Sequence, residues 1–126
     1  MVSNGMQYIS IFLVAAVAVE HLYIMVLEMF FWTKPRTLKL FGFSKELAEM
    51  TKPMAANQGL YNGFLSACLL WGIFHPNAEF GFQIKLFFLL CVLIAAVYGF
   101  FTVKRSILIM QGLPALLALC ALLLLG

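Results

Sequence analysis

Long apolar stretches alternate with shorter polar connections along this chain, and their lengths predict helices that cross a membrane. A spanning helix needs about 20 mainly apolar residues. Four stretches reach that length, over residues 8–32, 54–74, 80–103 and 106–125. A chain of 126 residues leaves room for one domain. We therefore expect an all-α membrane protein, with a single domain over residues 1–126 built as a bundle of four transmembrane helices.

The composition supports this assignment. Hydrophobic residues make up 64% of the chain and charged residues 10%, whereas a soluble domain averages about 25% charged residues. The segment before the first stretch, residues 1–7, contains no Lys or Arg, so the basic region of a signal peptide is missing. Cys68, Cys91 and Cys120 are isolated within apolar runs and lack the spacing of a metal site or a redox pair. We expect neither a signal peptide nor a metal site.

Basic residues gather in two of the three connections, and this asymmetry predicts how the chain is oriented. The connection over residues 33–53 and the connection between the third and fourth stretches together hold Lys34, Arg36, Lys39, Lys45, Lys52, Lys104 and Arg105. The opposite side holds Lys85 alone. The positive-inside rule places both basic connections in the cytoplasm and both termini outside. A net charge of +3 would suggest an acidic partner in a soluble protein, but here the distribution of the charges matters more than their sum, and we expect no nucleic-acid partner.

Small residues and prolines mark local features of the predicted helices. Gly59 and Gly63 form a GxxxG pattern, which allows close helix packing within the bundle or between chains, so a homo-oligomer stays open. Ser44 is a candidate cap for a short helix over residues 45–50, which would lie on the membrane surface or act as a linker. Pro114 removes a hydrogen bond and predicts a kink in the last helix.

Polar side chains within the apolar stretches are the candidate functional residues. By helical rise, several of them occupy overlapping depths in the cytoplasmic half of the membrane. The set consists of Glu20, His21 and Glu28 on the first stretch, Asn57, Gln58, Tyr61 and Asn62 on the second, and Gln111 on the fourth. We expect them to line a ligand-binding pocket that opens toward the cytoplasm. In the alternative, they only tie helices together, at about 0.6 kcal/mol for each contact.

The adjacent pair Glu20 and His21 falls near the membrane midplane. An ionisable side chain there costs about 2.5–3.5 kcal/mol on insertion scales, so such residues face a partner, a cavity or a pathway. Adjacent helical residues point about 100° apart, which leaves a direct bond between the two side chains unassured. An arrangement in which His21 and Glu28 share a bound molecule is equally compatible with the spacing.

Several of these residues lie within runs that resemble a known family. The runs are Glu20–Ile24, Glu28–Trp32, Ala56–Leu65 and Gln111–Leu117. They are similar to the small four-helix bacterial membrane proteins of the domain of unknown function 1304 family, over nearly the whole chain. The resemblance implies four spans and one domain, and implies little about activity. A looser similarity of architecture connects the chain to DoxX-like proteins, some of which are linked to quinone or thiol redox chemistry.

Three functions are compatible with the sequence. In the first, the protein binds or transports a small lipophilic or cationic ligand in competition with protons at Glu20, His21 and Glu28. In the second, it is a small membrane enzyme or redox subunit that acts on a quinone-like or lipid substrate, with an unknown cofactor. In the third, it is a structural or assembly subunit. No nucleophile with its base and no phosphate-binding loop is visible, so enzymatic activity remains undecided.

Overall fold

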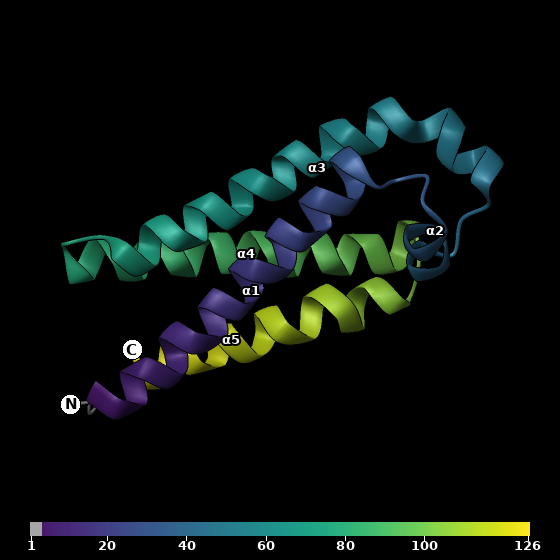
Figure 1. Cartoon of the computed structure of the whole chain (residues 1–126). Helices are drawn as coiled ribbons and strands as arrows, with labels where there is room; N and C mark the ends of the chain where they lie inside the picture. Colours follow the sequence, from purple (N-terminus) through teal and green to yellow (C-terminus); the bar gives the residue numbers. More distant parts are fainter. Residues whose placement is uncertain (1–3) are drawn as a thin grey trace. The chain divides into compact units, whose positions relative to one another are not determined.

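The computed structural model describes residues 4–126, and within them the protein is helical without strands. The segments in chain order are α1 (Asn4–Phe30), α2 (Pro35–Phe41), α3 (Lys45–Phe74), α4 (Ala78–Thr102), η1 (Leu108–Gly112) and α5 (Leu113–Leu125) (Figure 1). The chain divides into two compact units. The first unit contains the residues up to Val19 together with Leu65–Gly126, and the second contains Glu20–Phe64.

Three helices in the described part of the chain are long and apolar enough to cross a membrane. They cover Gly5–Phe30, Ala78–Thr102 and Leu108–Leu125, which correspond to three of the four predicted spans and are consistent with a membrane protein. The long helix α3 does not reach the same apolarity, because Asn57, Gln58 and Asn62 interrupt its hydrophobic run. Its role as the fourth span stays a prediction.

The first unit has an apolar core to which α1, α3, α4 and α5 all contribute. Its fully buried members include Val14 and Val17 of α1, Leu69 of α3, Leu89 of α4 and Leu122 of α5. The connection between α3 and α4 is tight, because the Asn77 side chain accepts a hydrogen bond from the Phe80 amide at 3.0 Å and begins α4.

Within the same unit, α4 packs against η1 and α5 as an antiparallel neighbour (Figure 1). The π-helix η1 ends two residues before Pro114, and the Leu113 amide donates to the carbonyl of Leu108, five residues earlier. Proline cannot donate to the carbonyl four residues before it, and a π-helical turn is one way to accommodate such a break. The structure thus has a π-helix before Pro114, and the kink predicted there stays a prediction.

The second unit is organised around Trp32, which directly follows the last turns of α1. The indole packs against Phe41 and Phe43, with ring centroids 5.1 and 5.6 Å away. Its Nε1 donates a hydrogen bond to the Thr51 hydroxyl of α3 at 3.1 Å. Short α2 ends at Gly42, whose φ of 73° is in the left-handed region that glycine adopts easily.

Helix α3 begins where the sequence predicted a cap but extends much further than expected. Ser44 accepts a hydrogen bond from the Leu47 amide at 3.1 Å, which confirms the cap. The helix then continues through Pro53 to Phe74 instead of ending near residue 50, so the separate short helix was wrong. Pro53 cannot donate a hydrogen bond to the carbonyl of Glu49, four residues earlier. Both residues are exposed, so solvent can donate to that carbonyl instead.

Candidate functional site

The last turns of α1 carry the three ionisable residues that the sequence singled out. Glu20, His21 and Glu28 all belong to the second unit. His21 is 1% exposed and Glu28 is 8% exposed, whereas the Glu20 side chain retains 28% of its accessible surface. The two carboxyl groups on this helix therefore occupy different environments.

Glu28 is held by a partner on α3. The Asn62 side-chain nitrogen donates a hydrogen bond to Glu28 Oε1 at 2.6 Å, and both side chains are buried. This close approach of the two helices depends on Gly59, because a methyl group added there would lie 2.7 Å from Met29 Cγ and 3.0 Å from Glu28 Cβ. The first glycine of the GxxxG pattern thus serves packing within the chain.

Gly63, the second glycine of this pattern, faces the same helix. A methyl group added at Gly63 would lie 2.6 Å from the sulfur of Met25. The sequence left open whether the two glycines pack within a chain or between chains. In the structure, both make room for side chains of α1 in the second unit.

Within residues 4–126, Glu20 has no such hydrogen-bond partner. Its Oε1 atom is buried, although the side chain as a whole retains 28% of its accessible surface. The nearest His21 ring nitrogen, Nδ1, lies 3.9 Å from that oxygen, which is beyond hydrogen-bonding distance. The two side chains therefore lie within electrostatic range of each other without a direct hydrogen bond, as the difference in their helical directions suggested.

The remaining predicted residues are not part of the buried pair. Asn57, Gln58 and Tyr61 lie on the exposed side of α3, and the Tyr61 side chain is 61% exposed. Gln111 lies in η1 of the first unit and is half-buried. The structure thus brings Glu28 together with Asn62 and places Glu20 next to His21. A pocket formed by all eight residues stays a prediction.

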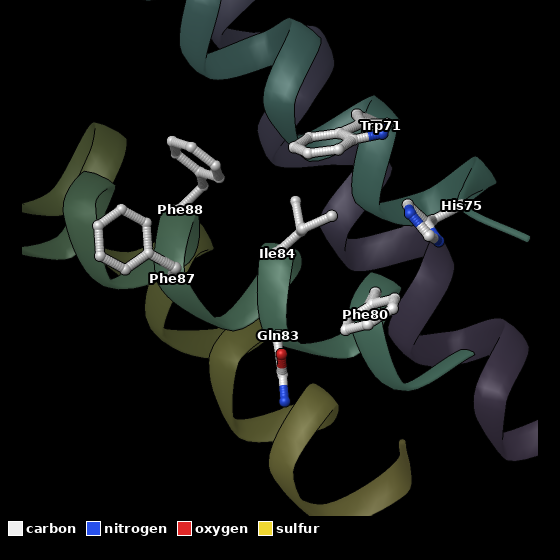
Figure 2. A pocket seen from close by; sticks show the side chains of 7 residues that line it. All are labelled: Trp71, His75, Phe80, Gln83, Ile84, Phe87 and Phe88. Atoms are coloured by element: carbon white, nitrogen blue, oxygen red, sulfur yellow. The ribbon is translucent and has the colours of Figure 1, made fainter. Parts of the chain in front are cut away.

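A separate cavity of about 350 Å³ lies at the connection between α3 and α4 in the first unit. Figure 2 shows that its walls are mostly aromatic, with Trp71, His75 and Phe80 on one side and Gln83 pointing away from them. The ring of His75 is held by the turn, because its Nδ1 accepts from the Asn77 amide at 3.0 Å. This histidine has a structural role in the turn, and the sequence had assigned it no function.

Sequence reasoning missed several polar residues that the helices bury. The Ser66 hydroxyl donates to the Ala18 carbonyl at 2.7 Å in the first unit, and Lys85 is 8% exposed although α4 is otherwise apolar. It also missed a cavity that includes Arg36 and Lys39. The available sequence signal was the pair Arg36 and Lys39, which lie three residues apart directly after Pro35, where a short helix can begin. Within residues 4–126, no cluster of three His, Cys, Asp or Glu residues has the arrangement of a metal site.

Comparison with known proteins identifies the family of this chain. The family model described as "Protein of unknown function (DUF1304)" matches residues 15–123. The chain belongs to the DUF1304 family. It is also similar to the uncharacterized protein YpaA of Lactococcus lactis subsp. lactis (strain IL1403), with 34% identity over 116 residues, which is 90% of this chain and 96% of YpaA.

The matched region of the DUF1304 model contains every candidate site residue named above, from Glu20 to Gln111. No solved structure matches the chain. These matches establish the DUF1304 family and do not show the looser likeness to DoxX-like proteins.

Proposed function

We propose that this DUF1304 protein is a four-span protein of the bacterial inner membrane that binds a small lipophilic or cationic molecule at an intramembrane carboxylate, Glu20. Three helices long enough to cross a membrane support the membrane location. An ionisable side chain inside such a helix is expensive to keep and commonly marks a binding site or a pathway.

The position of the two chain ends supports a fourth span. A methyl group added at Gly126 would lie 3.7 Å from the side-chain nitrogen of Gln7, so the beginning of α1 and the end of α5 lie together in the first unit. A chain whose ends lie on one side of a membrane crosses it an even number of times. Three crossings do not meet that condition, and α3 provides the fourth. The basic connections then face the cytoplasm, and both termini face outward.

The observation that carries the proposed function is the buried Oε1 atom of Glu20, which has no hydrogen-bond partner in the part of the chain that the structure describes. Leaving a buried polar atom unpaired costs about 1–3 kcal/mol, and more when the group is charged. A bound proton or a ligand cation removes that cost. The 28% of the Glu20 side chain that remains exposed gives such a ligand access.

Glu28 has a different role in this proposal. Asn62 already satisfies its buried oxygen, so the pair ties α1 to α3 and keeps the helix that carries Glu20 in place. His21 lies close enough to Glu20 to influence its charge, as a partner or a proton relay. Asn57, Gln58, Tyr61 and Gln111 remain proposed ligand contacts, because each retains accessible surface.

A second candidate function is that of a structural or assembly subunit. The hydrogen bond between Glu28 and Asn62 favours it, since it shows that at least one polar pair serves to join helices. In that case Glu20 would bind no molecule. The two functions therefore differ in what happens when the Glu20 carboxylate alone is neutralised.

Equilibrium binding of the lipophilic cation tetraphenylphosphonium to the purified protein tests the proposal. A proton and a cation compete for one carboxylate, so binding should be weaker at acidic pH than at mildly alkaline pH. Glu20→Gln should abolish both the binding and its pH dependence. Glu28→Gln is the matched control, because the glutamine side-chain oxygen can still accept the hydrogen bond from Asn62. This variant should retain both the binding and its pH dependence. Binding that is unchanged in Glu20→Gln would rule out Glu20 as the site.

A further inference from the structure

A second site is indicated by a cavity of about 480 Å³ in the second unit. It lies between the last turns of α1 and the short helix α2. Its lining consists of Tyr23 and Leu27 from α1 and Arg36, Thr37, Lys39 and Leu40 from α2. None of these residues belongs to the carboxylate site proposed above.

The lining divides into a cationic part and an apolar part. Arg36 and Lys39 are both exposed and lie three residues apart, so they are neighbours on the surface of α2. Tyr23 and Leu27 lie four residues apart on α1 and offer an aromatic and an aliphatic surface. Leu40 adds an aliphatic side chain that is 39% exposed. A ligand that fits both parts carries a negative charge at one end and a hydrocarbon surface at the other.

The surroundings of this cavity are typical of a membrane–water boundary. Trp32 follows the last turn of α1 and packs with Phe41 and Phe43. Tryptophan and other amphipathic aromatic side chains concentrate at headgroup level. Basic residues beside a membrane helix attract anionic lipids, with each cation contributing about fivefold in affinity. The cavity thus combines the depth, the charge and the apolar wall that such a lipid requires.

We propose that this cavity binds the headgroup of an anionic phospholipid. The lipid phosphate pairs with Arg36 and Lys39, and the first part of the acyl chain lies along Tyr23 and Leu27. A free phosphate ion would leave the apolar half of the lining without a partner. This site is independent of Glu20, so it holds even if the carboxylate binds no ligand.

The test measures the affinity of the detergent-solubilised full chain for short-chain phosphatidylglycerol and phosphatidylcholine by native mass spectrometry. The variant is the double substitution Arg36→Gln with Lys39→Gln. The matched control is Lys104→Gln with Arg105→Gln, which removes the same charge from two exposed residues outside the cavity. Circular dichroism of each variant checks that the helical content is unchanged.

We expect the wild type to prefer phosphatidylglycerol, and the cavity variant to lose about 25-fold in affinity for it, about fivefold for each cation. The control should lose less than about threefold, because Lys104 and Arg105 do not line the cavity and so make no direct pairing with a phosphate held there. Equal losses in the two variants would show only general attraction to basic residues and would overturn the proposal. So would equal binding of the two lipids by the wild type, a result that needs no variant.

Inorganic phosphate distinguishes a lipid from a soluble anion. Added in excess over the lipid, it should displace little phosphatidylglycerol from the wild type, since it makes no contact with Tyr23 or Leu27. Displacement at concentrations similar to that of the lipid would show that the cavity recognises a soluble phosphate, and the lipid assignment would be wrong.

Discussion

Replacing Asn62 with alanine removes the donor that holds the buried carboxyl group of Glu28. The hydrogen bond is 2.6 Å long, and each of the two residues is 8% exposed, so water cannot easily take the place of the lost amide. In soluble proteins a hydrogen bond to a charged group contributes about 1.5–3 kcal/mol. Between membrane helices the measured average is about 0.6 kcal/mol, with a maximum near 1.7 kcal/mol.

The environment of the pair places Asn62→Ala near the upper end of the membrane range. The substitution leaves Glu28 Oε1 unpaired and removes buried side-chain atoms beside Gly59, where α1 and α3 are in close contact. We therefore expect the free energy of unfolding to fall by about 1.5 kcal/mol. Asn57→Ala is the matched control, because Asn57 lies on the same helix and is exposed. It should change the unfolding free energy by less than about 0.5 kcal/mol.

Equilibrium unfolding in mixed detergent micelles, followed by circular dichroism, measures both variants under one condition. A double-mutant cycle with Glu28→Ala isolates the pair, and its coupling energy should be about 1 kcal/mol. Equal losses in Asn62→Ala and Asn57→Ala would refute the reasoning. A coupling energy of zero would also refute it, because Glu28 and Asn62 would then contribute independently.

Two further predictions concern packing and topology. Gly59→Leu should lower the free energy of unfolding by about 1–3 kcal/mol, because the Cβ of the new side chain would lie 2.7 Å from Met29 Cγ. Ala67→Leu, on the exposed side of α3, is the control and should be nearly neutral in the same unfolding assay. The topology is tested by cysteine labelling in a cysteine-free background. A membrane-impermeant maleimide added outside should label Glu79→Cys and should not label Glu46→Cys, because α3 separates these two exposed positions. Labelling of both positions would contradict the fourth span.

Apolar length alone was sufficient to predict the three helices that are long and apolar enough to cross a membrane. The stretches that form α1, α4 and the segment Leu108–Leu125 are dominated by hydrophobic side chains along their whole length. Every part of such a stretch therefore indicates a spanning helix. Helix α3 was harder to define from sequence. Its first turns are amphipathic and contain Pro53, so the pattern suggested an end where the helix continues. Tertiary contacts, such as the bond from Trp32 to Thr51, hold that part of α3 in place.

The candidate residues were visible in the sequence, but their pairing was not. Composition and spacing identified Glu20, Glu28 and Asn62 as polar groups in apolar surroundings. The partner of each group depends on the register between α1 and α3, which is set by side chains meeting Gly59 and Gly63. A single sequence carries no direct signal for that register. It therefore could not separate the satisfied carboxyl group of Glu28 from the unpaired oxygen of Glu20.

The cavity between α1 and α2 was missed for a related reason. Arg36 and Lys39 entered the sequence argument only through their charge, as evidence for the orientation of the chain. The short helix that places them beside Tyr23 and Leu27 gives no long periodic pattern. Its position depends on packing of Phe41 against Trp32, which is a tertiary contact.

Native mass spectrometry in mild detergent tests the central claim most directly, because it weighs whatever molecule the protein carries and requires no choice of ligand. Wild type, Glu20→Gln and Glu28→Gln are compared after identical purification. We expect a bound molecule other than a phospholipid, of defined mass, on the wild type and on Glu28→Gln, and its loss from Glu20→Gln. Phospholipid held at the cavity between α1 and α2 does not enter this comparison, because that cavity is independent of Glu20. Spectra in which none of the three proteins carries such a non-phospholipid molecule, or in which Glu20→Gln retains it, would contradict the carboxylate site.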